Sequence, residues 1–146
     1  DHLEAYGAHL VQNFGSGVQS CYRGPRLYDA DETRILVKDT VTWYKKYRAI
    51  LDSDIIHVRR PDGRDIDCML HVNPALKQRG MAMVYNPLSE PVKRRLRLPL
   101  YYTGLTGAAQ ILDREGASKA YALDRQFNVE VPVEIPARGY SWLMIE

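Results

Sequence analysis

The hydrophobic period changes once along this chain of 146 residues, and that change constrains the fold more than any other feature. Up to about Ser53, apolar residues recur every three or four positions, as they do on one face of an α-helix. From residue 54 onward they alternate with polar residues, as in strands with one buried face. The sequence therefore predicts two domains, a helical part over 1–53 and a β-rich part over 54–146.

The helical part contains two predicted helices. The first covers 2–13 and is followed by Gly15, as expected just past a helix end. The second runs from about Asp31 to Leu51, with Asp29 or Asp31 as its N-cap. Its aromatic and aliphatic stripe follows the 3.6-residue period, so we expect that stripe to pack against one face of the β-rich part.

Residues 17–21 read as one isolated strand between these helices. A parallel-type strand without neighbours leaves backbone donors and acceptors unpaired. We therefore expect residues 1–28 to be less stably ordered than the rest. The alternative is that they pair with a second copy of the chain in a non-native dimer.

Polar side chains cluster where this strand turns into the loop before the second helix. Gln19, Tyr22 and Arg23 occupy the position that substrate-binding groups take in a βα-barrel. A purely structural interpretation is equally good, in which Arg23 and Arg26 pair with acidic residues such as Asp29.

The second part reads as an antiparallel, two-sheet β-sandwich. The segment 55–72 forms a hairpin around Pro61-Asp62-Gly63, where proline fixes φ and glycine accepts the left-handed position. The segment 80–87 is apolar on both faces, which indicates a central strand. Five further strands are predicted over 92–100, 108–114, 118–124, 127–135 and 140–146, separated by Gly, Pro and Asn turns.

Two charged clusters have competing interpretations. Asp62, Asp65 and Asp67 suggest calcium, but a hairpin does not wrap such residues around one ion, so a solvated hairpin is favoured. The run Lys93 to Arg97 could grip phosphate, but the alternation favours the solvent-facing side of an edge strand, where positive charge opposes aggregation.

Aromatic residues gather in the predicted strands and turns of the second part. They could form a sugar-stacking platform, although aromatic residues in strands more often belong to the core. The five residues concerned are Tyr101, Tyr102, Tyr121, Tyr140 and Trp142.

Composition excludes several kinds of partner. The net charge is +2, too small for a nucleic-acid footprint, and no run approaches the roughly 20 apolar residues of a membrane span. No Cys or His pair has zinc-ligand spacing, and no dinucleotide or phosphate-loop fingerprint occurs, so no metal or cofactor is expected. Cys21 and Cys68 either form one bridge or, as their strand positions favour, remain free thiols.

The acidic residues do not form a recognisable catalytic pair. They lie in turns, at exposed strand positions or on the polar face of a helix, and none has an apolar frame that would raise its pKa. No catalytic residue is therefore assigned.

The order of elements and three sequence segments resemble the C-terminal ends of bacterial glycoside hydrolases of the α-galactosidase-like type. The segments are NFGSGVQSCYRGPRLYD (13–29), GMAMVYNPLSEPVKRRLRLPLYYTGL (80–105) and VEVPVEIPARGYSWLMIE (129–146). The resemblance implies the last βα unit of a (β/α)₈ barrel over 1–53, followed by a C-terminal β-sandwich.

The same resemblance implies a non-catalytic fragment that braces the catalytic barrel of a parent chain in carbohydrate degradation. The carbohydrate substrate would be engaged through the parent, whose nucleophile and acid/base lie on earlier strands, so this chain alone should be inactive. Only Gln19, Tyr22 and Arg23 match a rim position. A periplasmic or secreted location is compatible with such a parent.

The alternative function is an autonomous carbohydrate-binding module. That function needs an exposed, planar row of aromatic rings, whereas the fragment interpretation expects Trp43, Tyr44 and Tyr47 to pack against the sheet.

Overall fold

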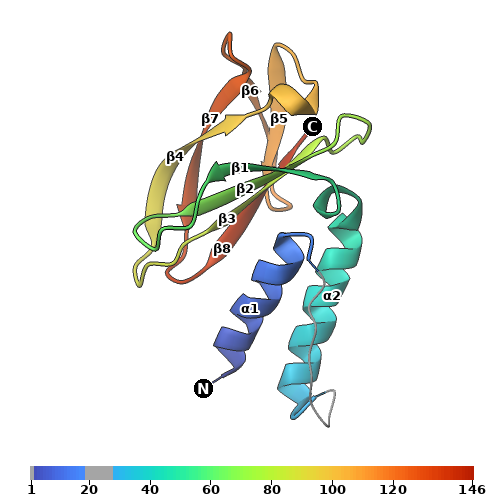
Figure 1. Ribbon diagram of the computed structural model, residues 1–146, viewed down its shortest axis with the longest axis vertical. Helices are drawn as coiled ribbons and strands as arrows, with labels where there is room; N and C mark the ends of the chain where they lie inside the picture. The colour runs from blue at the N-terminus through green and yellow to red at the C-terminus, as the bar shows by residue number, and fades with distance from the viewer. Residues whose placement is uncertain (1, 19–27) are drawn as a thin grey trace. The chain divides into compact units, whose positions relative to one another are not determined.

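The computed structural model describes residues 2–18 and 28–146, which divide into two compact units, Asp1–Asp52 and Ser53–Glu146 (Figure 1). The first consists of helices α1 (Leu3–Gly15) and α2 (Asp31–Leu51). The second holds eight strands and one short 3₁₀ helix.

Helices α1 and α2 pack against each other through aromatic and aliphatic residues. The rings of Phe14 and Tyr44 lie 4.8 Å apart between centroids. Tyr47 and Leu51 are buried, whereas Trp43 is half-buried with its ring 5.8 Å from that of Tyr47. The packing of this stripe against the sandwich stays a prediction.

The expected side-chain cap of α2 is wrong. Its N-cap residue is Ala30, which offers no side-chain acceptor, and Asp31 already lies inside the first turn. Asp31 instead forms an ion pair with Arg34 at 3.3 Å, and its negative charge still suits the positive end of the helix.

The isolated strand and its loop lie almost wholly outside the described residues. After α1, Gly17 adopts a left-handed φ of 69° and the Val18 amide donates to the Asn13 carbonyl at 2.9 Å, which closes the helix end. Residues 19–27 are not described, so pairing of residues 1–28 with a second copy stays a prediction.

The second unit confirms a mainly β fold made of two antiparallel sheets (Figure 1). Six strands form one sheet in the order β1-β2-β3-β8-β5-β6, and β4 pairs with β7 in a separate sheet. The strand bounds are β1 Asp54–Arg59, β2 Asp67–Val72, β3 Gly80–Tyr85, β4 Val92–Pro99, β5 Ala108–Asp113, β6 Ser118–Ala122, β7 Asn128–Ile135 and β8 Tyr140–Ile145.

The two sheets enclose one apolar core. Alternate residues of β4 and β7 face the six-stranded sheet, because each strand places every second side chain on the same side. Fully buried members come from both sheets and include Leu70, Val84, Leu98, Ile135 and Ile145.

The opposite face of the six-stranded sheet is also apolar. Met83 pairs with Trp142, and Met81 pairs with Met144, so these four side chains share the face that points away from the two-stranded sheet. A strand that is apolar on both faces must be central, and β3 does lie between β2 and β8.

The hairpin of β1 and β2 is confirmed, with a longer connection than the sequence suggests. Gly63 has the expected left-handed φ, at 70°. However, β1 ends at Arg59 and β2 begins at Asp67, so Asp65 lies in the loop and does not share a strand face with Asp67. The register also shifts between His57 and Arg59, which marks a bulge.

Candidate functional site

Gln19, Tyr22 and Arg23, the substrate-binding residues suggested by the sequence, lie outside the described residues. The structure therefore neither brings them together nor separates them. The remaining candidates are the polar clusters and the aromatic residues of the sandwich.

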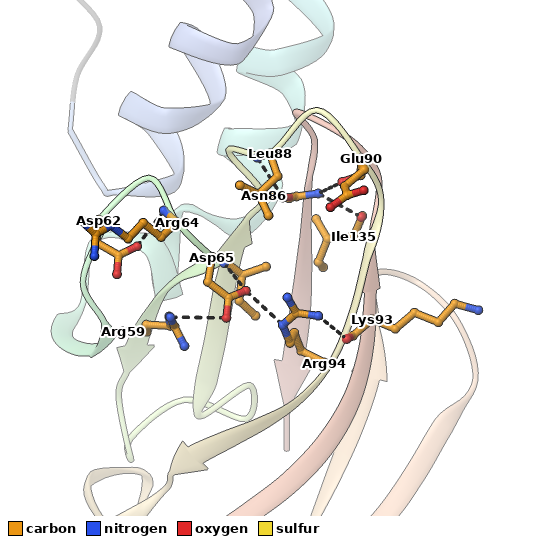
Figure 2. Close-up of polar contacts among 11 residues, drawn as sticks. Arg59, Asp62, Arg64, Asp65, Asn86, Leu88, Glu90, Lys93, Arg94 and Ile135 are labelled. Atoms are coloured by element: carbon orange, nitrogen blue, oxygen red, sulfur yellow. Dashed lines mark hydrogen bonds and ion pairs between the residues drawn. The ribbon is translucent and has the colours of Figure 1, made fainter.

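Asp65 is the centre of an ion-pair cluster that ties the β1–β2 loop to β4 (Figure 2). Its carboxylate lies 3.0 Å from Nε of Arg94 and 3.3 Å from an Nη of Arg59. It also accepts the backbone N–H of Ile66 at 2.8 Å. With only 21% of its side chain exposed, Asp65 joins the two sheets, and its oxygens are already occupied.

Asn86 is the second polar centre and organises the loops at one end of the sandwich (Figure 2). It is 2% exposed. Its Nδ2 donates to the carbonyls of Glu90 at 2.8 Å and Pro136 at 2.9 Å, while its Oδ1 accepts the Leu88 amide at 3.0 Å. Such a buried amide with all its groups paired is a structural feature, not a reactive one.

Asp62 and Asp67 have pKa values displaced in opposite directions. A hydrogen bond from the Arg64 amide lowers the pKa of Asp62. Burial, followed by the charge of Asp62, raises the pKa of Asp67 although Arg59 opposes this. The expectation that no carboxyl has a frame that raises its pKa is therefore wrong for Asp67.

Opposed pKa values can mark an acid and base pair, but these two carboxyls lack the surroundings for that chemistry. Asp62 sits in an exposed turn and uses Oδ1 to hold the Arg64 amide at 2.9 Å. Glycoside hydrolysis needs the glycosidic bond to be held between two carboxyls in a cleft. A solvated turn, such as the one that carries Asp62, does not form the wall of a cleft.

The cations of β4 are matched by acidic partners. Lys93 pairs with Glu134 at 3.3 Å and Arg95 with Glu130 at 3.2 Å, on the exposed side of the β4–β7 pair. A shallow depression of about 430 Å³ adjoins them and is lined by Lys93, Arg94, Arg95, Asp113, Pro132, Val133 and Glu134. With both charge signs in its wall, this depression has no strong preference for an anion.

Among residues 2–18 and 28–146, no group of three or more His, Cys, Asp or Glu side chains is placed to hold a metal ion. No helix in that part of the chain is long and apolar enough to cross a membrane. Cys68 is a free, buried thiol, and burial raises its pKa to about 12, which removes it as a nucleophile at neutral pH.

The five aromatic residues that could form a platform divide into core and surface. Trp142 is 8% exposed and stacks on Tyr140, with ring centroids 6.2 Å apart. The Arg114 guanidinium lies 5.1 Å from the Trp142 ring and donates to the Tyr140 carbonyl. Tyr121 is half-buried against the core. These three aromatic residues are structural.

Tyr101 and Tyr102 lie on the surface. They occupy the 3₁₀ helix η1 (Tyr101–Thr103), and they have the two largest exposed fractions among the large apolar residues described, 62% and 64%. Their rings are nearly perpendicular, at 89°, so they do not form the planar row that the alternative function requires. Tyr101 also contacts the ring of Phe127, with centroids 5.5 Å apart.

No protein-family model matches the chain, and no curated protein sequence matches it. Solved structures do share its fold. An α-amylase from Geobacillus thermoleovorans matches 100% of the chain with a TM-score of 0.60 and 10% identity, and α-galactosidase I from Mortierella vinacea matches 98% with 0.59 and 9%. A Bacillus halodurans protein proposed to be an α-N-acetylgalactosaminidase matches 99% with 0.63 and 10%.

The chain spans about a third of the length of each of these structures, 34%, 35% and 32% respectively. At such low identity the likeness concerns the fold alone. The neighbours are glycoside hydrolases, and the fold they share with this chain includes both the helices and the sandwich.

Proposed function

We propose that this chain is the C-terminal part of a glycoside hydrolase, whose β-sandwich braces the catalytic barrel and has no glycosidase chemistry of its own. The observation that carries the proposal is the likeness over 98–100% of the chain to about a third of each enzyme. Residues 1–53 would then be the last unit of the barrel, and Gln19, Tyr22 and Arg23 would lie on its substrate rim.

The neighbours are named for different enzymatic activities, and this difference favours a structural role for the sandwich. One is an α-amylase and another an α-galactosidase, although both contain the fold of this chain. A fold common to enzymes with different substrates does not by itself choose the substrate. The chemistry and the choice of sugar would therefore reside in the part of the longer protein outside this chain.

The test compares this chain with the longer protein encoded by its full reading frame. Both are purified and incubated with a panel of aryl α- and β-glycosides. Two carboxyls must flank the scissile bond about 5–9.5 Å apart, and no such catalytic pair is assigned in this chain. We therefore expect turnover only by the longer protein. Hydrolysis by the 146-residue chain at a rate comparable to that of the longer protein would overturn the proposal.

A second candidate function, carbohydrate binding at one exposed ring rather than on a planar row, is favoured by one observation, the exposure of Tyr101 and Tyr102. It differs from the first in that the sandwich itself would hold sugar. The two candidates are compatible within one longer protein, and they are separated by different measurements.

A further inference from the structure

One surface of the sandwich combines exposed aromatic rings with neighbouring polar side chains. We call it the η1 surface and define it by Arg97, Tyr101, Tyr102, Gln126 and Phe127. Its two halves are fixed side by side, because the Leu100 amide donates to the Phe127 carbonyl at 2.8 Å and the rings of Tyr101 and Phe127 are in contact.

The aromatic half is rigidly held. Thr103, which closes η1, is buried, and its hydroxyl donates to the Leu100 carbonyl at 2.6 Å and accepts the Leu105 amide at 3.2 Å. The backbone that carries Tyr101 and Tyr102 is thus fixed although their rings are exposed. Side chains carried on a backbone that is fixed before binding lose less conformational entropy when a ligand stacks on them.

Phe127 has a backbone conformation that calls for an explanation. Its φ is 61°, in the left-handed region that bulky residues rarely adopt. Asp124 holds this loop in place, since its Oδ1 accepts hydrogen bonds from the backbone amides of Gln126 and Asn128 at 2.8 and 2.9 Å. These hydrogen bonds, from Asn128 first, lower the pKa of Asp124. The strained residue places its ring against Tyr101, and such strain concentrates at binding sites.

The polar half carries donors and acceptors but almost no net charge. Arg97 is 3.2 Å from the Asp124 carboxylate and donates to Oε1 of Gln126 at 3.2 Å. One cation and one carboxylate balance, so a polyanion gains little there. The side-chain amide of Gln126 and the guanidinium of Arg97 remain suited to hydroxyl groups.

We propose that the η1 surface binds a neutral saccharide. The C–H face of one sugar ring would lie on the ring of Tyr102, the more exposed of the two tyrosines, whose π-face is negative, while hydroxyl groups hydrogen-bond to Gln126 and Arg97. Because Tyr101 and Tyr102 are perpendicular, a ligand stacks on one ring only. The surface thus takes one or two sugar units rather than a long flat chain.

This inference rests on the second candidate function and deepens it, because it names the binding surface and the class of sugar, and it involves no hydrolysis. The experiment is an amide NMR titration of the whole chain with maltoheptaose and, separately, with galactomannan oligosaccharides. A heparin oligosaccharide serves as the charged comparison. We expect one of the neutral glycans to bind with a Kd on the order of 1 mM, since a shallow surface buries little of the ligand. The shifts should concentrate in residues 101–103 and 124–128.

Two variants test the two halves separately. Tyr102→Ala removes an exposed ring, and Gln126→Ala removes a hydroxyl partner but leaves both tyrosines. We expect each to weaken binding at least tenfold with an unchanged thermal melt. Tyr28→Ala, which removes an exposed tyrosine of the other unit, should bind as the unmodified chain does.

Three results would overturn the inference. The first is no shift with either neutral glycan at about ten times the expected Kd. The second is unchanged affinity in the Tyr102→Ala variant. The third is a response to heparin stronger than to the neutral glycans, or shifts that appear on concentrating the protein alone, which would indicate a charged ligand or self-association. None of these outcomes bears on the hydrolysis assay, so the two proposals fail separately.

Discussion

At the scale of single residues, Asn86 is the most demanding side chain of the sandwich. Replacing it with Ala leaves the carbonyls of Glu90 and Pro136 and the amide of Leu88 without their buried partner. We expect Asn86→Ala to lower the free energy of unfolding by about 2–3 kcal/mol, because each unsatisfied buried group costs about 1–3 kcal/mol and the loops can partly relax. Urea unfolding followed by circular dichroism measures this.

Asn86→Asp provides the matched comparison, since it keeps the shape and replaces the donor with an oxygen. A carboxylate would face the carbonyl oxygens that Nδ2 now serves. We expect this variant to be the less stable of the two at pH 7 and to regain stability on acidification, when the carboxyl can donate again. Equal stability of both variants at every pH would contradict the role given to Nδ2.

Asp67 should make the free energy of unfolding depend on pH in the opposite direction from a salt-bridged carboxylate. Its pKa in the folded chain is raised, chiefly by burial, so the folded state binds the proton more tightly than the unfolded state does. Stability must therefore fall as pH rises from the unfolded pKa through the raised one. Asp67→Asn removes that loss.

We expect Asp67→Asn to raise the free energy of unfolding at pH 7 by less than about 1 kcal/mol, because solvent screens a partly exposed group. The gain should vanish below the ordinary Asp pKa, near pH 3. Thermal melts of both proteins at pH 3 and pH 7 decide this. A variant that is less stable at pH 7 would show that Arg59 outweighs burial.

At the scale of elements, strand β4 offers two arginines in different surroundings. Arg94 reaches Asp65 across the sheets with 42% of its side chain exposed, whereas Arg95 pairs with Glu130 on the outside at 76%. We expect Arg94→Ala to cost about 1 kcal/mol and Arg95→Ala about 0–0.5 kcal/mol, since exposed pairs contribute little. Chemical unfolding of both variants tests the ranking, and a larger loss from Arg95→Ala would reverse it.

Much of the element structure follows from local pattern. The alternation of Val129, Val131, Val133 and Ile135 with polar residues predicts strand β7, and the 3.6-residue stripe predicts α2, which runs over the expected residues. The order of strands does not follow, because pairing β8 between β3 and β5 joins segments far apart in sequence. Local pattern does not encode which distant partner a strand finds.

Local pattern predicts the exposure of individual aromatic residues less well than it predicts the strands. Tyr101 and Trp142 look equivalent in the sequence, yet one is exposed and the other buried, because η1 follows the end of β4 while Trp142 lies within β8. The left-handed Phe127 carries no sequence signal, since glycine or asparagine is usual in that conformation. The raised pKa of Asp67 likewise depends on packing rather than on its neighbours in the chain.

At the scale of the whole molecule, Cys68 reports the opening of the sandwich. The thiol is 2% exposed within the core, and its pKa of about 12 leaves it protonated at pH 8. In a Cys21→Ser variant, whose one remaining thiol is Cys68, we expect alkylation only at the rate of global unfolding. Denaturant should raise the labelling rate in proportion to the unfolded population. Rapid labelling without denaturant would contradict a closed core.

The second apolar face of the six-stranded sheet sets the last prediction. Met81, Met83 and Met144 share that face, and the two-stranded sheet covers only the other one. Leaving such side chains in water forfeits about 1.5–3 kcal/mol each and exposes a patch of the kind that marks an interface. Residues 53–146 produced alone should therefore bind a hydrophobic dye and self-associate.

The matched variant carries Met83→Lys and Met144→Lys, which keep long side chains but make the same face polar. Within the isolated sandwich we expect this variant to stay monomeric in sedimentation and to bind less dye. In the whole chain the same two changes should lower stability, because Met83 and Met144 are buried and an unpaired buried charge is costly. An isolated, unmodified sandwich that stays monomeric and free of dye would show that this face needs no cover, and the bracing role proposed for the sandwich would lose its physical basis.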